Sequence, residues 1–183
     1  GTMGQMMGPV ELPEVEVKTT EKDWTVTGTQ MKRKHNIINS LYLKPEILEE
    51  KNFERYERYK YIEEHEARHE SFMMDDAEIC VAAYGIAARV AKNAVVAARK
   101  EGIKVGMIRP ITLWPFPKAP LAEAAKTVKA FISVELSMGQ MIEDIKLATE
   151  CKKPVYLCNR VGGMIPAPEE VLAKIMEVKG GCK

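Results

Sequence analysis

The feature that most constrains the fold is an alternation of apolar, β-rich runs with helical segments in the second half of the chain. Strands are predicted at 79–84, 104–108, 130–134 and 154–158, and helices at 86–101, 119–128, 137–149 and from residue 168 onward. A strand that is followed by a helix and then by another strand favours a mainly parallel sheet with right-handed crossovers. We therefore predict a three-layer α/β/α sandwich over residues 77–179.

Local signals support several boundaries of these helices. Gly102 directly follows the helix predicted at 86–101, and glycine commonly terminates a helix at this position. Ser137 and Gln140 have the spacing of a capping box, which predicts that the side chain of Ser137 caps the following helix. Pro168 and two acidic residues open the last helix. One apolar stripe is expected on that helix, made of Val171, Leu172, Ile175 and Met176.

The first 76 residues have a different character and divide into two parts. Residues 1–44 show no sustained helical period, although 24–28 resembles a strand, so we expect extended chain and loops. Pro45 suits a first helical position, and the stretch from Glu46 to Phe72 lacks Gly and Pro and is rich in Glu, Lys and Arg. This predicts one long, exposed, charged helix of about 25 residues, and a linker to residue 76.

Histidines and cysteines give no strong metal signal. His65 and His69 would lie one turn apart on the predicted helix, which is metal-ligand spacing, but we favour two solvated histidines. Cys80, Cys151, Cys158 and Cys182 stand singly, so neither a zinc site nor an iron–sulfur site is predicted. Idle thiols, rather than disulfides, fit a chain in which no secretory signal is visible.

Charge and hydropathy restrict the location and the partners. The longest nearly unbroken apolar run, 79–88, is half of the roughly 20 residues that span a membrane. We expect a cytoplasmic protein that binds neither membrane nor nucleic acid, since basic clusters with interleaved aromatics are missing. Residues 1–76 carry a net charge of −5 and residues 77–183 one of +6. A basic second half suits an anionic ligand or an acidic partner, although we favour ordinary surface solvation.

Ligands of parallel sheets bind at the carboxyl ends of the strands, and four positions there attract attention. Gly85 opens a helix as in dinucleotide sites, but Gly-Ile-Ala-Ala lacks the second glycine of that fingerprint. Arg109 and Arg160 are weak candidates for holding an anion, and a salt bridge is the alternative for Arg109. Glu135 suits a general acid or base if buried, but we favour a residue that orients a loop.

Other positions are predicted to be structural or to lie at interfaces. Gly162 and Gly163 fit a turn that needs positive φ. Trp114 and Phe116, flanked by prolines, form a rigid apolar knob, either core or interface anchor. The complete set of structural or interface candidates is Gly85, Arg109, Pro110, Trp114, Phe116, Glu135, Gly139, Gln140, Gly162 and Gly163. No catalytic residue is predicted, because no Ser/His/Asp or Cys/His arrangement can be drawn.

Several strings resemble the second domain of the α-subunit of 2-oxoacid:ferredoxin oxidoreductases. The most specific runs from Ile103 to Pro117 and includes Arg-Pro-Ile-Thr-Leu-Trp-Pro-Phe-Pro; 76–85, 135–144 and 160–166 continue the match. The opening residues 4–10 look like the tail of a preceding thiamine-pyrimidine domain. The charged helix looks most similar to the branched-chain type, which acts on 2-oxoisovalerate (3-methyl-2-oxobutanoate).

This resemblance implies a transketolase C-terminal-like fold and a role in a larger enzyme. In the family, thiamine diphosphate with Mg²⁺ attacks the 2-oxo acid, electrons pass through iron–sulfur clusters to ferredoxin, and the acyl group passes to coenzyme A. Partner subunits carrying the thiamine diphosphate and the iron–sulfur clusters are implied. The glutamate that activates the cofactor and the Gly-Asp-Gly diphosphate motif are missing. We expect a piece of a longer subunit that binds none of these cofactors and is inactive alone.

Three hypotheses remain open at this point. The first is a non-catalytic structural and docking domain of such an oxidoreductase. The second is a module of the same complex that binds coenzyme A through Arg109 and Arg160. The third is a free-standing dinucleotide-binding domain, which the incomplete glycine pattern disfavours.

Overall fold

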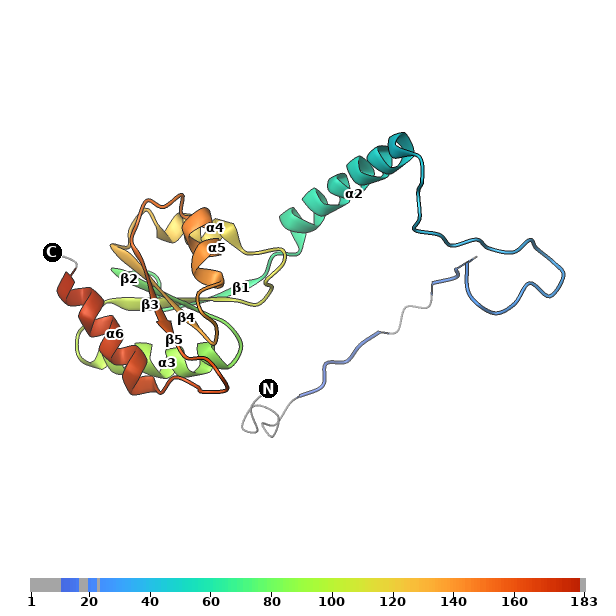
Figure 1. Ribbon diagram of the computed structural model, residues 1–183. Coiled ribbons are helices and arrows are strands. Elements are labelled where there is room, and N and C mark those ends of the chain that lie inside the picture. The colour runs from blue at the N-terminus through green and yellow to red at the C-terminus, as the bar shows by residue number, and fades with distance from the viewer. Residues whose placement is uncertain (1–10, 17–19, 23, 182–183) are drawn as a thin grey trace.

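A five-stranded sheet with helices on both faces forms the body of the protein (Figure 1). The computed structural model describes residues 11–16, 20–22 and 24–181. In chain order, the elements are α2 (Pro45–His65), β1 (His69–Phe72), β2 (Ile79–Ala83), α3 (Gly85–Lys100), β3 (Val105–Pro110), α4 (Lys118–Ala124), β4 (Ala130–Glu135), α5 (Met141–Ala148), β5 (Val155–Asn159) and α6 (Pro168–Gly181). The predicted α/β/α sandwich is confirmed.

The strand order explains where the carboxyl ends of the strands meet. The sheet runs β1-β3-β2-β4-β5, in which β3, β2, β4 and β5 are parallel and β1 is antiparallel to β3. The chain leaves β2 toward β3 on one side and then returns to β4 on the other side. This reversal puts a topological switch point between β2 and β4, so Gly85 and Leu136 follow two adjacent strand ends.

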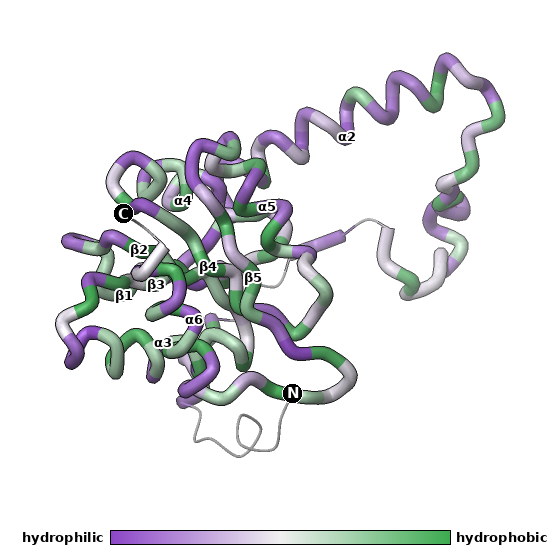
Figure 2. The backbone as a smooth tube through the Cα atoms, turned by 60° about the vertical axis from the view of Figure 1, so that its left-hand side comes forward, coloured by the Kyte–Doolittle hydropathy of each residue, from purple (hydrophilic) through white to green (hydrophobic). Residues whose placement is uncertain are grey.

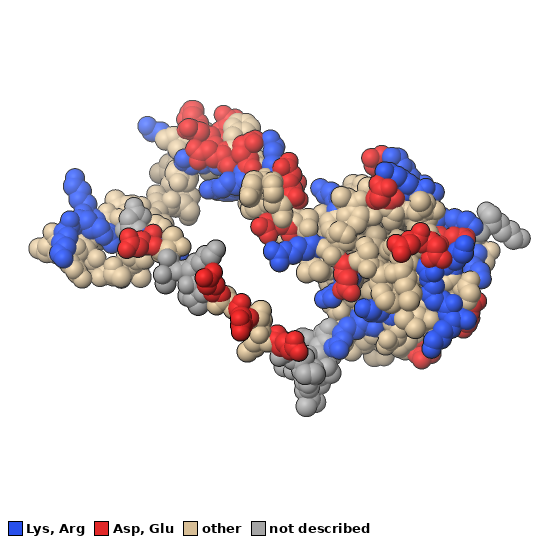
Figure 3. Space-filling model, turned by 180° about the vertical axis from the view of Figure 1, so that it is seen from behind, with Lys and Arg blue, Asp and Glu red and all other residues tan. Residues whose placement is uncertain are grey.

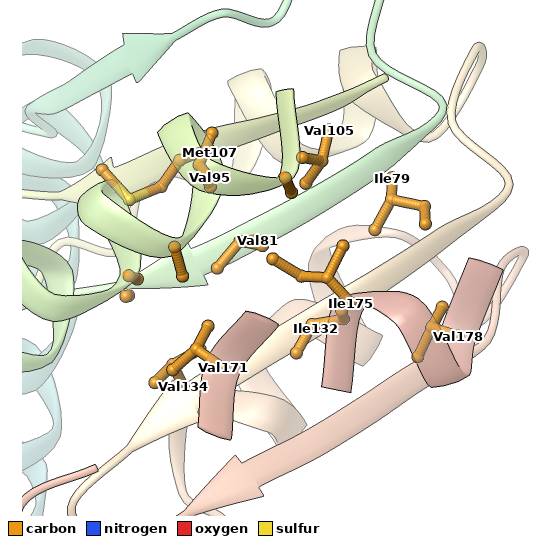
Figure 4. Close-up of a cluster of buried hydrophobic side chains, with 14 of the residues drawn as sticks. Ile79, Val81, Val95, Val105, Met107, Ile132, Val134, Val171, Ile175 and Val178 are labelled. Carbon is orange, nitrogen blue, oxygen red and sulfur yellow. The ribbon is translucent and has the colours of Figure 1, made fainter. Parts of the chain in front are cut away.

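Two apolar clusters, one on each face, hold the layers together. α3 and α6 cover one face with Ala91, Val95, Val171 and Ile175, as Figure 4 shows in part. On the other face, α4 and α5 bury a second set of side chains, which comprises Leu121, Val128, Phe131, Met141 and Ile145. The strands alternate between the two clusters, as the two-residue period of a strand requires. Full burial of each large side chain contributes about 1.5–3 kcal/mol to stability.

The predicted helix from Glu46 to Phe72 is too long, and this expectation was wrong at its C-terminal end. α2 ends at His65, and His69 to Phe72 form β1, which pairs antiparallel with β3. Backbone hydrogen bonds of Ile111 and Thr112 to Arg68 fix the connection. Helix propensity is a weak preference, and pairing with β3 overrides it over these four residues.

α2 projects from the sheet and buries none of its own residues (Figure 1). Its tube is largely hydrophilic in Figure 2, and acidic and basic side chains are interleaved over it in Figure 3. Before α2, the described residues of 11–44 contain neither helix nor strand, so the strand-like appearance of 24–28 was misleading. The first ten residues of the predicted tail lie outside the described part. No helix in that part is long and apolar enough to cross a membrane.

Two smaller differences concern helix lengths and faces. The helix predicted at 119–128 is α4, which ends at Ala124 and continues as turns that still bury Val128. On α6, Val171 and Ile175 are buried as expected, whereas Met176 is 41% exposed and Val178 takes the buried position instead. A spacing of three or four residues from Ile175 reaches Val178, but one residue does not stay on the same face.

Candidate functional site

A basic hollow lies at the carboxyl ends of β2 and β3, where Gly85 and Arg109 come together. It has a volume of about 350 Å³, and its lining consists of Glu70, Gly85, Ala88, Arg89, Lys92, Met107 and Arg109. We call this site the basic hollow. Sequence reasoning identified Gly85 and Arg109 but missed Glu70, Arg89 and Lys92. The helical spacing from Gly85 to Arg89 and Lys92 could have revealed two of them, since i, i+4 and i+7 share one face.

The missed strand β1 supplies the carboxylate that, among the described residues, lines the basic hollow. Glu70 stands directly opposite Arg109 in the antiparallel register. Nη1 of Arg109 donates to Oε2 of Glu70 (3.1 Å), and Nζ of Lys92 lies 3.5 Å from Oε1. The hydrogen bond from Arg109 and the nearby Lys92 hold the pKa of Glu70 below its usual value, although desolvation opposes them. Glu70 therefore stays ionised at neutral pH and fixes two cations beside the hollow. Thus a salt bridge, the alternative foreseen for Arg109, is present.

Glu135 lies in a separate, fully buried cluster at the end of β4. Its Oε1 accepts hydrogen bonds from Oγ of Ser133 (2.7 Å) and from the backbone N–H of Ile142 (2.9 Å). Its Oε2 accepts three more hydrogen bonds, from Oγ of Ser137 (2.7 Å) and from the backbone N–H groups of Gln140 (2.8 Å) and Met141 (3.0 Å). The carboxylate thus satisfies the backbone donors that the first turn of α5 leaves unpaired.

This geometry corrects the predicted capping box. The side chain of Ser137 donates to Glu135, and Gln140 makes no side-chain cap at the N-terminus of α5. Burial alone would raise the pKa of Glu135, but the hydrogen bonds from Ser137, Ser133 and the helix backbone outweigh it and lower the pKa. An ionised carboxylate with five donors has no proton to give, so its geometry suits positioning of the 136–141 loop. Gly139, at φ +104, lies within this loop.

Arg160 is remote from the basic hollow, so the two candidate arginines do not form a common site. β2 and β4 lie between β3, which carries Arg109, and β5, which precedes Arg160. The guanidinium of Arg160 pairs with Glu170, whose carboxylate also accepts the backbone N–H of Ala167 (2.8 Å). This pair ties the loop after β5 to the first turn of α6. In that loop, Gly162 and Gly163 take positive φ values of +64° and +86°.

The two candidate metal-binding histidines do not share a helix face. His65 is the last residue of α2 and stacks on Tyr61 with ring centroids 4.2 Å apart, whereas His69 begins β1. The i,i+4 helical spacing assumed for them is therefore absent. Within the described residues, no group of three or more His, Cys, Asp or Glu side chains is placed to hold a metal ion.

An apolar surface surrounds Trp114, where α2 meets the loop after β3. The indole of Trp114 is 56% exposed and packs edge-on against Tyr59, with ring centroids 5.2 Å apart. A hollow of about 550 Å³ opens between Tyr56, Tyr59 and Trp114, and a second of about 630 Å³ extends from Trp114 to Leu147. We call the surface made of Tyr56, Tyr59, Leu113, Trp114 and Leu147 the Trp114 surface. Phe116 is half-buried against the α4–α5 cluster, and Pro110 is buried at the end of β3.

Comparison with known proteins gives consistent matches. Residues 77–171 match the family model for pyruvate:ferredoxin oxidoreductase core domain II. Ketoisovalerate oxidoreductase subunit VorB of Methanothermobacter marburgensis is 47% identical over 97% of this chain and 50% of its own length. The chain thus spans about half the length of this relative.

Two solved structures share the fold. The 2-oxoglutarate:ferredoxin oxidoreductase from Magnetococcus marinus, solved with 2-oxoglutarate, coenzyme A and succinyl-CoA bound, superimposes with a TM-score of 0.65 and 23% identity, covering 74% of this chain and 24% of that one. A split gene transketolase, in an inactive β4 tetramer, gives a TM-score of 0.55 and 17% identity over 63% of this chain and 42% of its own. At these identities the likeness extends to the fold alone.

Proposed function

This chain belongs to the pyruvate:ferredoxin oxidoreductase core domain II family, and from this we propose that it supplies that domain to the α-subunit of a ketoisovalerate-type 2-oxoacid:ferredoxin oxidoreductase. The observation that carries the proposal is the 47% identity to a ketoisovalerate oxidoreductase subunit over 97% of the chain. The assembled enzyme would decarboxylate 2-oxoisovalerate oxidatively, form the acyl-CoA and reduce ferredoxin. The family match begins at residue 77, which supports a domain boundary between 45–76 and 77–179.

We further propose that this domain positions other parts of the enzyme and does not itself hold the redox cofactors. Its donor set does not fit them: Cys80 is buried, Cys151 and Cys158 are single, and no described cluster of acids or histidines suits Mg²⁺. Iron–sulfur clusters need several thiolates in one place. Thiamine diphosphate, Mg²⁺ and the iron–sulfur clusters are therefore assigned to the remaining polypeptide and its partner subunits.

The Trp114 surface is the proposed contact with the rest of the enzyme. Tyr56 is 64% exposed, Leu113 50% and Leu147 75%, so large apolar side chains face outward around the two hollows, with charged residues such as Glu63 and Lys118 beside them. Clustered exposed apolar groups of this kind mark interaction sites, and aromatic anchors carry much of the binding energy. The chain covers half the length of its relative, so the other half of such a subunit is the proposed occupant. Residues 1–44 would be the connection toward it.

Replacing Trp114 with alanine in the assembled oxidoreductase should weaken docking by about 2–4 kcal/mol, because an exposed aromatic anchor is lost. In a complex assembled from this chain and the separately produced other half of the subunit, the expected result is dissociation at micromolar concentration, seen by analytical ultracentrifugation, with a parallel loss of viologen-linked 2-oxoisovalerate oxidation. Circular dichroism of the variant chain checks that the fold is intact.

Met176→Ala is the matched control, since Met176 is an exposed apolar residue on α6, on the other face of the sheet. It should leave assembly unchanged. Tyr56→Ala, which alters the same hollow as Trp114, should weaken docking in the same direction. Full assembly of both the Trp114 and the Tyr56 variants would refute the docking role of this surface.

A further inference from the structure

We propose that the basic hollow is a binding site for a phosphoryl group, carried by a small phosphorylated molecule or by the terminal phosphate of a larger one. The site is built by Glu70, Arg89, Lys92 and Arg109, from β1, α3 and β3. This inference does not depend on the proposed function, because it rests on the charges and donors of the hollow itself.

The charge of the basic hollow matches a phosphate dianion. Three cationic side chains and one carboxylate line it, which gives a net charge of +2. One carboxylate oxygen of Glu70 accepts a hydrogen bond from Arg109, and the other accepts one from Lys92. Glu70 thereby holds both cationic groups at the rim of the hollow. A phosphate monoester carries about −1.5 to −2 charges at pH 7, which would neutralise the remaining excess. A carboxylate would leave about one positive charge uncompensated.

Hydrogen-bond donors remain available for such a ligand. Arg89 is exposed and has no hydrogen bond or ion pair to any described residue. Nε of Arg109 is buried and lacks a partner among the described residues, although the Nη1 of the same group is bound to Glu70. A buried N–H without an acceptor is costly, and a phosphate oxygen that reached this N–H would remove that cost. Planar guanidinium groups suit phosphate because they bind it through two donors.

The start of α3 adds backbone donors beside the same hollow. The first helical hydrogen bond runs from the N–H of Ala88 to the carbonyl of Tyr84, so earlier N–H groups have no intrahelical acceptor. Gly85 lines the hollow at φ +56°, and no atom lies within 4 Å of the position where a Cβ would stand. A ligand can therefore approach the backbone closely there, where the helix dipole favours an anion.

The size of the hollow limits what enters it. A volume of about 350 Å³ is at the small end of ligand pockets, which run from about 300 to 1,000 Å³. This accommodates a phosphoryl group and a short attached moiety, whereas an entire dinucleotide or coenzyme A would extend outside. The recognised chemistry is thus the phosphate, and the rest of a larger ligand would lie over the rim.

The test is a titration of the 183-residue chain with inorganic phosphate at constant ionic strength, with potassium chloride in the reference cell. Binding is followed by calorimetry and by the NMR signal of the Arg109 Nε–H group. Arg89→Gln should weaken phosphate binding about tenfold or more, because a charged hydrogen-bond donor is lost. The variant should fold normally, since Arg89 has no described internal partner to lose.

Lys104→Gln is the matched control, because Lys104 lines a separate pocket, which also contains lysines but lies at the amino ends of the strands. It should leave phosphate affinity unchanged. Competition by coenzyme A, but not by the same molecule without its phosphates, would identify coenzyme A as a source of the phosphoryl group; free phosphate binding without competition would identify a small phosphorylated ligand. No phosphate binding beyond that of chloride, or an equal loss in the Arg89 and Lys104 variants, would overturn the proposal.

Discussion

Replacing Glu135 with glutamine should lower the free energy of unfolding by about 3 kcal/mol, one of the two largest effects on folding stability expected for a single substitution in this chain. The carboxylate accepts five hydrogen bonds, and three of them come from the backbone at the start of α5. The amide nitrogen of glutamine would face N–H donors instead of accepting from them. Thermal unfolding should show a fall in Tm of roughly 6–12 °C, given the size of the chain.

The same carboxylate predicts a pH dependence with a definite sign. The pKa of Glu135 lies below its usual value of about 4.3 in the folded state, so its stabilisation is present above about pH 4.3 and is lost as the pH falls through the lower, folded-state pKa. The free energy of unfolding, measured with denaturant at several pH values from neutral to acid, should therefore fall more steeply for the natural chain than for Glu135→Gln.

Glu143 is an exposed acid on α5, and Glu143→Gln is the control. This substitution should change the free energy of unfolding by less than about 1 kcal/mol. Equal stability of the Glu135 variant would contradict this role.

Gly106→Ala should destabilise the fold by about 2–3 kcal/mol, because there is no room for a Cβ at this point of β3. A Cβ at Gly106 would overlap the carbonyl oxygen of Met73 and approach Sδ of Met74 to 2.6 Å. The carbonyl cannot easily retreat, since Nη2 of Arg99 donates to it (2.7 Å). Nε and Nη1 of the same arginine are engaged by the carbonyl of Val105 and by Asp76.

Chemical denaturation of Gly106→Ala should show a lower midpoint with an unchanged slope. Gly180→Ala is the control, because nothing lies within 4 Å of a Cβ there and alanine favours the helix α6. Its stability should be unchanged or slightly higher. If Gly106→Ala were as stable as the control, the connection between β1 and β2 would have to be looser than its contacts with Arg99 imply.

The parallel part of the sheet was predictable because its signals are long and local. Each strand from β2 to β5 is apolar and is bounded by a glycine, a proline or a helix with a clear period, so periodicity alone identifies it. β1 was not predictable, since four residues show too little alternation to compete with a charged, helix-favouring context. Because β1 was not predicted, Glu70 was not recognised as a site residue either. Only the antiparallel pairing of β1 with β3 brings Glu70 to Arg109.

The candidate sites were predictable to different degrees for similar reasons. Glu135 was favoured as a loop-orienting residue, and its position at a strand end indicated as much. Which donors it meets depends on the path of residues 136–141, which no local pattern gives. Arg160 and Arg109 each follow a strand, but strand order decides whether they meet, and two strands separate them. Trp114 was recognised as a core or anchor residue, and only its 56% exposure favours the anchor.

The most direct test of the proposed role is a domain exchange in the ketoisovalerate oxidoreductase of Methanothermobacter marburgensis. This chain would replace the matching half of the VorB subunit, to which it is 47% identical, and the chimera would be assayed for viologen-linked oxidation of ketoisovalerate. We expect the chimera to assemble and to retain activity within about tenfold, a difference of 1.4 kcal/mol in barrier, while the chain alone is inactive. Activity of the isolated chain, or an assembled chimera that no longer oxidises ketoisovalerate, would contradict the account.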